Sequence, residues 1–156
     1  MDDRPIYLDY NATTPVLPEV VDAMLPYLRE HFGNPSSSHV YGRRTQAAID
    51  RARVQVAGLI GCDASEIIFT SGGTEANNLA IRGVAEARDA LRAVVTTVIE
   101  HPATAQPCAW LERHGWRVTR VGVDRDGRAR AEEARAAIDT TTALVTVMHS
   151  NNETGV

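Results

Sequence analysis

The segment IIFTSGGTEANNLAIRG, residues 67–83, joins an apolar stretch to a helix-like pattern through the turn Ser71–Thr74. A turn at a helix N-terminus suits an anion, because the first backbone N–H groups lack partners and the helix dipole is positive there. Gly72 and Gly73 allow a close approach and a positive φ, and Thr74 can cap the helix and donate its hydroxyl to a phosphate oxygen. The turn fits neither the Walker nor the dinucleotide pattern. On these residues alone, a turn that merely caps a helix is the simpler alternative.

Two further polar segments follow apolar stretches. VIEHPAT places His101 after residues 93–99, and MHSNNETG places Asn151 and Asn152 after residues 143–148. Ligands of open parallel sheets bind beyond the carboxyl ends of the strands, so we expect the phosphate-binding turn, the imidazole and a carboxamide at one edge. A lone histidine is more often structural or solvated than catalytic, but three such segments together favour a common site.

The elements that must position these residues alternate between strands and helices. Strands are expected at 66–70, 93–99, 116–123 and 143–148, after an extended segment 6–10. Helices are expected from Pro18 and over 42–60, 74–90, 104–114 and 132–138. This alternation predicts right-handed βαβ units and an α/β fold, with a mainly parallel sheet between two helical layers.

Local residue types predict where these elements begin, end and bury themselves. Pro26 should kink or split the first helix, and Gly61 should cap the end of the second. The polar loop 31–39, HFGNPSSSH, is long enough to be a candidate functional loop. In helix 74–90 one face is apolar and is expected to pack against the core. It is formed by Ala76, Leu79, Ala80, Val84 and Ala87.

Composition narrows the classes of function. A chain of 156 residues can bury one real core, and its net charge of −4 gives no basic field for nucleic acid or an anionic membrane. The absence of a signal-peptide pattern and of an apolar run near about 20 residues makes a cytoplasmic location the expectation. Cys62 and Cys108 are expected as reduced packing residues. His101, Cys108 and His114 lack the spacing of a zinc motif, so no metal site is expected.

Five motifs in chain order, YLDYNATTP, FGNPSSSH, FTSGGTEANNLAI, EH and MHSNNETG, resemble the N-terminal portion of the cysteine desulfurases. These are pyridoxal phosphate enzymes of the aminotransferase class V group. The resemblance covers essentially the whole chain and implies part of the large domain of a fold-type I enzyme. It implies a single incomplete domain, with residues 1–40 as an N-terminal segment and loop and 41–156 as the front of the cofactor-binding domain. The polar ending after a buried strand agrees with an architecture that continues beyond Val156.

The resemblance also implies roles for individual residues. Gly73 and Thr74 match the pair that holds the cofactor phosphate. His101 matches the catalytic imidazole that stacks on the pyridine ring and moves protons, tasks that suit a flat group titrating near neutrality. Asn152 matches the amide that hydrogen-bonds the phenolic oxygen of the cofactor.

The reaction implied by the resemblance removes sulfur from L-cysteine, giving L-alanine and an enzyme-bound persulfide for iron–sulfur cluster and thio-cofactor synthesis. All 16 basic residues of this chain are arginine. It therefore has no lysine to bind the cofactor covalently, and neither cysteine matches the family's sulfur acceptor. We expect the isolated chain to be inactive and to act in a homodimer or with a complementing C-terminal half, serving sulfur-acceptor scaffold proteins. The alternatives are a selenocysteine lyase or another class V aminotransferase-like parent, and a non-catalytic interaction fragment.

Overall fold

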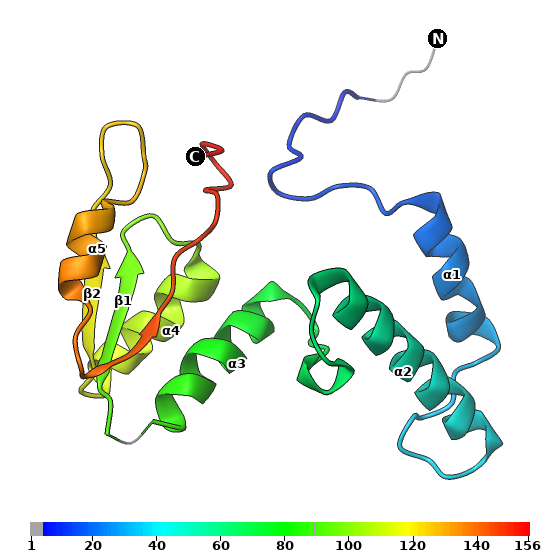
Figure 1. Cartoon of the computed structure of the whole chain (residues 1–156). Coiled ribbons are helices and arrows are strands. Elements are labelled where there is room, and N and C mark those ends of the chain that lie inside the picture. Colours follow the sequence, from blue (N-terminus) through cyan, green and yellow to red (C-terminus); the bar gives the residue numbers. More distant parts are fainter. Residues whose placement is uncertain (1–4, 89) are drawn as a thin grey trace. The chain divides into compact units, whose positions relative to one another are not determined.

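In the computed structural model, which describes residues 5–88 and 90–156, the chain divides into the units Met1–Phe69 and Thr70–Val156. Sequence predictions that involve residues 1–4 or Asp89 lie outside the described residues. The first unit contains helices α1 (Pro18–Arg29) and α2 (Val40–Ile60) and the short 3₁₀ helix η1 (Ala64–Glu66) (Figure 1). No helix in the described part of the chain is both long and apolar enough to cross a membrane.

Helix α1 starts with Pro18 in its first turn and runs through Pro26 to Arg29, so the predicted split at Pro26 is wrong. A proline removes one N–H donor, and its effect is small here because the helix ends within a turn. The carbonyl of Pro26 accepts the backbone N–H groups of Glu30 and His31, which closes the helix. Residues 6–10 join no strand.

Helix α2 is bounded by a histidine and a glycine. The Nδ1 atom of His39 accepts the N–H of Gly42 at 3.4 Å, and Gly61 ends the helix at φ 74°, which confirms the predicted C-cap. The preceding loop is confirmed as irregular and lies close to α2, since a Cβ on Gly33 would stand 2.5 Å from the carbonyl oxygen of Tyr41. Only glycine fits that approach.

The strand predicted at residues 66–70 is wrong. Glu66 ends η1, and no strand of the described chain pairs with Ile67–Thr70. The carbonyl of Ile67 accepts a hydrogen bond from the Arg53 guanidinium instead, and Ile68 is 68% exposed. An apolar, β-branched segment therefore has strand composition without the partner strand that a ladder requires.

The second unit is an α/β layer structure. Its elements are α3 (Gly73–Glu86), β1 (Ala93–Thr97), α4 (Pro102–Arg113), β2 (Arg117–Val121), α5 (Ala131–Ala137) and β3 (Thr142–Val145). The strands form a parallel sheet in the order β2-β1-β3, with Val95 opposite both Thr119 and Val145. All residues of β1 are buried, and Figure 1 shows α5 on one side of the sheet and α3 and α4 on the other. The predicted α/β fold with a parallel sheet between helical layers is confirmed.

The core of this unit lies between the sheet and the pair α3–α4. Its buried residues are Ile81, Ala85, Val94, Cys108, Leu111 and Trp116. Helix α3 thus buries the face of Ile81 and Ala85, while Leu79, on the predicted face, is 48% exposed. Burial raises the pKa of the Cys108 thiol, which confirms Cys108 as a packing residue.

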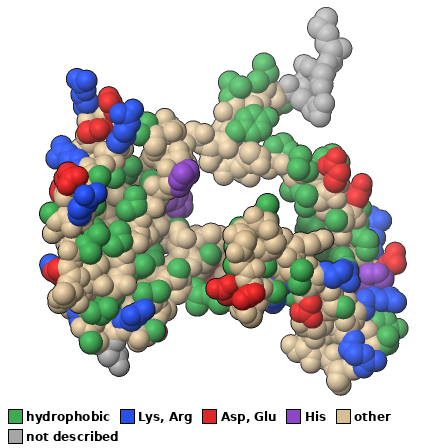
Figure 2. Space-filling view, viewed as in Figure 1, with side chains coloured by type: hydrophobic (Ala, Val, Ile, Leu, Met, Phe, Trp, Pro, Cys, Tyr) green, Lys and Arg blue, Asp and Glu red, His purple; other side chains and the backbone are tan. Residues whose placement is uncertain are grey.

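The first unit leaves much apolar surface uncovered. Helix α1 has no buried residue, and Val20, Met24 and Leu28 are 45%, 50% and 69% exposed. Apolar side chains accordingly appear over the surface of both units in Figure 2.

Leu111→Ala should lower the free energy of unfolding by about 2–5 kcal/mol, because a fully packed leucine leaves a cavity when truncated. The matched change Leu79→Ala removes the same atoms from a half-exposed site and should cost about 1 kcal/mol or less. Urea denaturation of both variants measures the difference. Equal losses would contradict the assignment of the core face.

Candidate active site

The N-terminus of α3 is open to a ligand. Gly72 is its N-cap residue and no side chain caps the helix there. Instead, Glu75 accepts hydrogen bonds from the backbone N and the hydroxyl of Ser71, both at 2.6 Å, and these bonds lower the pKa of the Glu75 carboxyl. The prediction that Thr74 caps the helix is therefore wrong. Its exposed hydroxyl makes no hydrogen bond to another described residue, so it is available to a ligand.

The positive φ predicted for the two glycines of the turn is wrong, whereas the structure leaves room for the predicted close approach. Gly72 has φ 165°, which is extended backbone, and Gly73 is the first residue of α3; neither adopts the left-handed region. A Cβ added to either would meet no atom within 4 Å. The space in front of the turn is open, so a glycine here lets a ligand approach the backbone N–H groups of the first turn.

His101 is held in place by the start of α4. It is the N-cap residue, and its Nδ1 atom accepts the backbone N–H of Ala103 at 3.0 Å. Helix α4 begins at Pro102, two residues earlier than predicted, because proline suits the first turn and the imidazole replaces a usual capping side chain. With Nδ1 acting as acceptor, the neutral ring carries its proton on Nε2.

A side-chain hydrogen bond places the N-termini of α3 and α4 side by side. The amide of Asn77 donates to the hydroxyl of Thr104 at 3.0 Å. Asn77 lies three residues after Thr74, and Thr104 lies three residues after His101. Since α4 directly follows β1, both helices begin at the carboxyl edge of the sheet.

The loop after β3 is tied to the same edge by Glu100. One oxygen of this carboxylate accepts both the hydroxyl of Thr97, at 2.6 Å, and the backbone N–H of Met148, at 2.9 Å. The amide of Asn151 adds a second link between the two segments by donating to the carbonyl of Ile99 at 3.1 Å. The segments that follow β1 and β3 are thus fixed to each other.

The two asparagines of this loop differ in their surroundings. The Oδ1 atom of Asn151 accepts the backbone N–H groups of Glu153 and Thr154 at 3.0 and 3.1 Å, which shapes the loop. Asn152 is exposed, and its amide donates to the carboxylate of Glu153 at 2.8 Å. An amide NH₂ has two donors, so Asn152 keeps one for a ligand.

Sequence reasoning placed Asn151 at this edge but gave no role to Glu100 or Asn77, which also hold it together. Glu100, Asn77 and Asn151 all act through hydrogen bonds between segments that are distant in sequence. The adjacency of Glu100 to His101 was the only signal available for the first of them. No group of three metal-ligating side chains occurs within the described residues.

The family follows from comparison with known proteins. The family model Aminotransferase class-V matches residues 6–156. The chain therefore belongs to this family, and the cysteine desulfurases within it use pyridoxal phosphate.

Within the family, the similar proteins include a cysteine desulfurase and a NifS-like protein. Cysteine desulfurase IscS of Dictyoglomus turgidum is 48% identical over 153 residues, which cover 97% of this chain and 39% of the relative. Among solved structures, a NifS-like protein matches with a TM-score of 0.90 and 38% identity, over 94% of this chain and 41% of that one. SspA in complex with cysteine matches with a TM-score of 0.89 and 38% identity, over 94% and 43%. The chain thus spans about two fifths of the length of these relatives.

The residues at this edge are compatible with pyridoxal phosphate. Open space at Gly72 and Gly73 and the unpaired hydroxyl of Thr74 suit a phosphate group. The imidazole of His101 is flat, exposed and fixed by its cap bond. Asn152 retains an amide donor for an oxygen atom.

Glu100→Ala should free the loop after β3, because two donors lose their acceptor at a cost of about 1–3 kcal/mol. Amide hydrogen exchange should report this as faster exchange at Met148. Glu100→Gln keeps a carbonyl oxygen in the same place and should largely preserve the protection. If Met148 exchanged equally slowly in the alanine variant, Glu100 would not hold the two loops together.

Proposed function

We propose that the chain is the N-terminal part of a cysteine desulfurase, which converts L-cysteine to L-alanine and an enzyme-bound persulfide. The observation that carries the proposal is the shared edge of the sheet. There the open N-terminus of α3, the capped imidazole of His101 and the loop of Asn152 are linked by hydrogen bonds. The high identity to proteins of that name supports the choice within the family.

Gly73 and Thr74 would hold the cofactor phosphate, through backbone N–H groups and a hydroxyl respectively. Pyridoxal phosphate, when bound, supplies an electron sink for bond cleavage at the amino acid. Asn152 would donate its remaining N–H to the phenolic oxygen of the cofactor.

His101 would be the catalytic residue of this part of the enzyme. Because Nδ1 accepts the N–H of Ala103, Nε2 is the atom free to give or take a proton. The cap bond also fixes the plane of the ring, which favours stacking on a flat heterocycle. One bond thus sets both the tautomer and the orientation.

Other parts of the reaction need groups that these 156 residues do not contain. The 156 residues include no lysine, so covalent attachment of the cofactor would require an amine from elsewhere. Under this proposal residues 1–40 are an N-terminal segment and 41–156 the front of the cofactor-binding domain. The complete enzyme would be a cytoplasmic homodimer that passes sulfur to acceptor scaffold proteins, and these 156 residues alone would be inactive.

Cofactor binding tests the proposal through Thr74→Val. The variant should bind pyridoxal phosphate at least about tenfold more weakly, because a hydrogen bond to a charged group contributes about 1.5–3 kcal/mol. Its affinity for pyridoxal, which has no phosphate, should not change. Thr140→Val, an exposed threonine in the turn before β3, is the matched control and should change neither affinity. Equilibrium dialysis measures all four values, and equal loss for both ligands would refute the phosphate role.

Borohydride reduction followed by mass spectrometry tests whether any side chain of these residues attaches the cofactor covalently. The chain incubated with pyridoxal phosphate should acquire a covalent adduct only at its N-terminal amine, because no side-chain amine is present. Stoichiometric modification at any internal residue would contradict the assigned chemistry. Release of alanine from L-cysteine by the chain alone would contradict the expected inactivity.

A further inference from the structure

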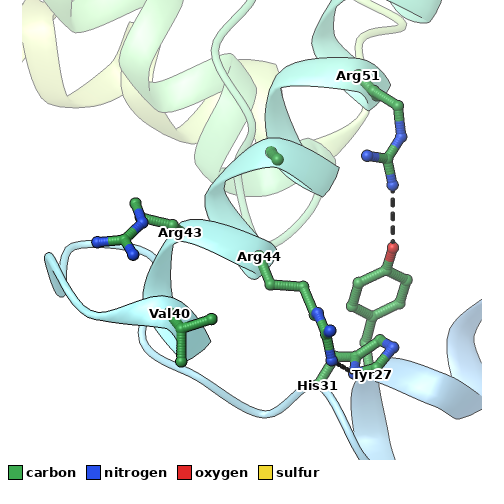
Figure 3. A pocket seen from close by; sticks show the side chains of 7 residues that line it. Tyr27, His31, Val40, Arg43, Arg44 and Arg51 are labelled. Carbon is green, nitrogen blue, oxygen red and sulfur yellow. Dashed lines mark hydrogen bonds between the residues drawn. The ribbon is translucent and has the colours of Figure 1, made fainter.

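A cleft of the first unit lies between helices α1 and α2, and none of its lining residues belongs to the elements that carry the candidate active site. It is lined by Tyr27, His31, Val40, Arg43, Arg44, Ala47 and Arg51. Figure 3 shows the side chains of Arg44 and Arg51 extending from α2 towards His31 and Tyr27. Its volume of about 550 Å³ is open to solvent.

Among the described residues, the hydrogen-bond partners of the guanidinium groups of this cleft are an imidazole, a phenol hydroxyl and a backbone carbonyl. Arg44 contacts Nδ1 of His31 at 3.4 Å, Arg51 donates to the hydroxyl of Tyr27 at 3.3 Å, and Arg43 donates to the carbonyl of Ser38. Within residues 5–88 and 90–156, no carboxylate lies within 4 Å of these three arginines. None of the residues that line the cleft is acidic.

Some arginines of the second unit, by contrast, form salt bridges with carboxylates of the same chain. In the second unit Arg82, Arg117 and Arg120 each pair with a carboxylate, at 3.4, 2.6 and 2.8 Å. The cleft is therefore a concentration of uncompensated positive charge in a chain whose net charge is −4. Planar guanidinium groups favour carboxylates and phosphates, which can accept two parallel hydrogen bonds.

The spacing of the arginines along α2 is compatible with an extended anionic ligand. Arg44 and Arg51 are seven residues apart on one helix, so their backbones are separated by about 10 Å along the axis. Carboxylates on one side of an extended peptide recur about every 7 Å, so two or three of them could contact the whole row.

From this charge and spacing we propose that the α1–α2 cleft is a docking surface for an acidic segment of a protein partner. The partner's carboxylates pair with Arg44 and Arg51, and Arg43 lies at the end of the row. The proposal is independent of the cofactor site, because its residues all belong to α1, α2 and the loop between them.

Fluorescence anisotropy with a fluorescein-labelled peptide of alternating glutamate and serine tests the proposal. The double variant Arg44→Gln/Arg51→Gln keeps good helix formers on α2 and should bind this peptide at least about tenfold more weakly. The matched control Arg125→Gln/Arg128→Gln removes the same charge from an exposed turn and should change the affinity by less than about twofold. Equal urea midpoints for the double variant and the unaltered chain would show that the fold is retained.

Three results would overturn the proposal. Equal weakening in both double variants would mean that net charge alone attracts the peptide. Equal binding of a glutamine–serine peptide would remove the role of carboxylates. Failure of the acidic peptide to bind, or its displacement by equimolar pyrophosphate, would mean that the cleft does not select an extended acidic segment.

Discussion

Parallel pairing of β1 with both β2 and β3 is the constraint on which the candidate site depends. Parallel strands present their carboxyl ends at one edge, so the segments after β1 and β3 emerge together. The return of α3 to the start of β1 brings the N-terminus of that helix to the same edge. The sheet thereby gathers three segments that are distant in sequence, and Glu100 fixes two of them with a single carboxylate oxygen.

The groups that hold this edge are distinct from the groups that face a ligand. Asn151 has its side chain committed to the backbone of Ile99, Glu153 and Thr154, whereas Asn152 remains exposed. The two residues are identical in type and adjacent in sequence, so residue type alone does not distinguish them, and only the resemblance to a family motif favoured Asn152 as the ligand-facing residue. His101 combines the two functions, because the bond that caps α4 also orients the ring.

Much of the fold was predictable because its signals are local. Gly61 ends α2 with a positive φ, as its residue type predicted, and the alternation of strands and helices predicted the parallel sheet. Predictions failed where the outcome depends on distant partners. Ile67–Thr70 has strand composition but no pairing strand in the described residues. Helix α3 has apolar residues on two faces, and only packing against α4 and the sheet selects that of Ile81 and Ala85.

For the candidate site, too, local features could be predicted from the sequence, whereas the hydrogen-bond partners of individual side chains could not. Glycine and hydroxyl residues before a helix indicate an anion site from local physics alone. In the structure, however, no side chain caps α3, and the carboxylate of Glu75 instead accepts two hydrogen bonds from Ser71, the residue before the N-cap. The hydroxyl of Thr74 makes no hydrogen bond to another described residue, so it is available to a ligand.

The exclusive use of arginine sets a chemical limit on everything these residues can do. A guanidinium stays protonated at any physiological pH and forms no covalent bond with a carbonyl cofactor, so the basic residues can act only through charge and hydrogen bonds. In the second unit several of them pair with carboxylates of the same chain. Along α2 they face a cleft without acidic residues, where the same physical chemistry favours an anion from another molecule.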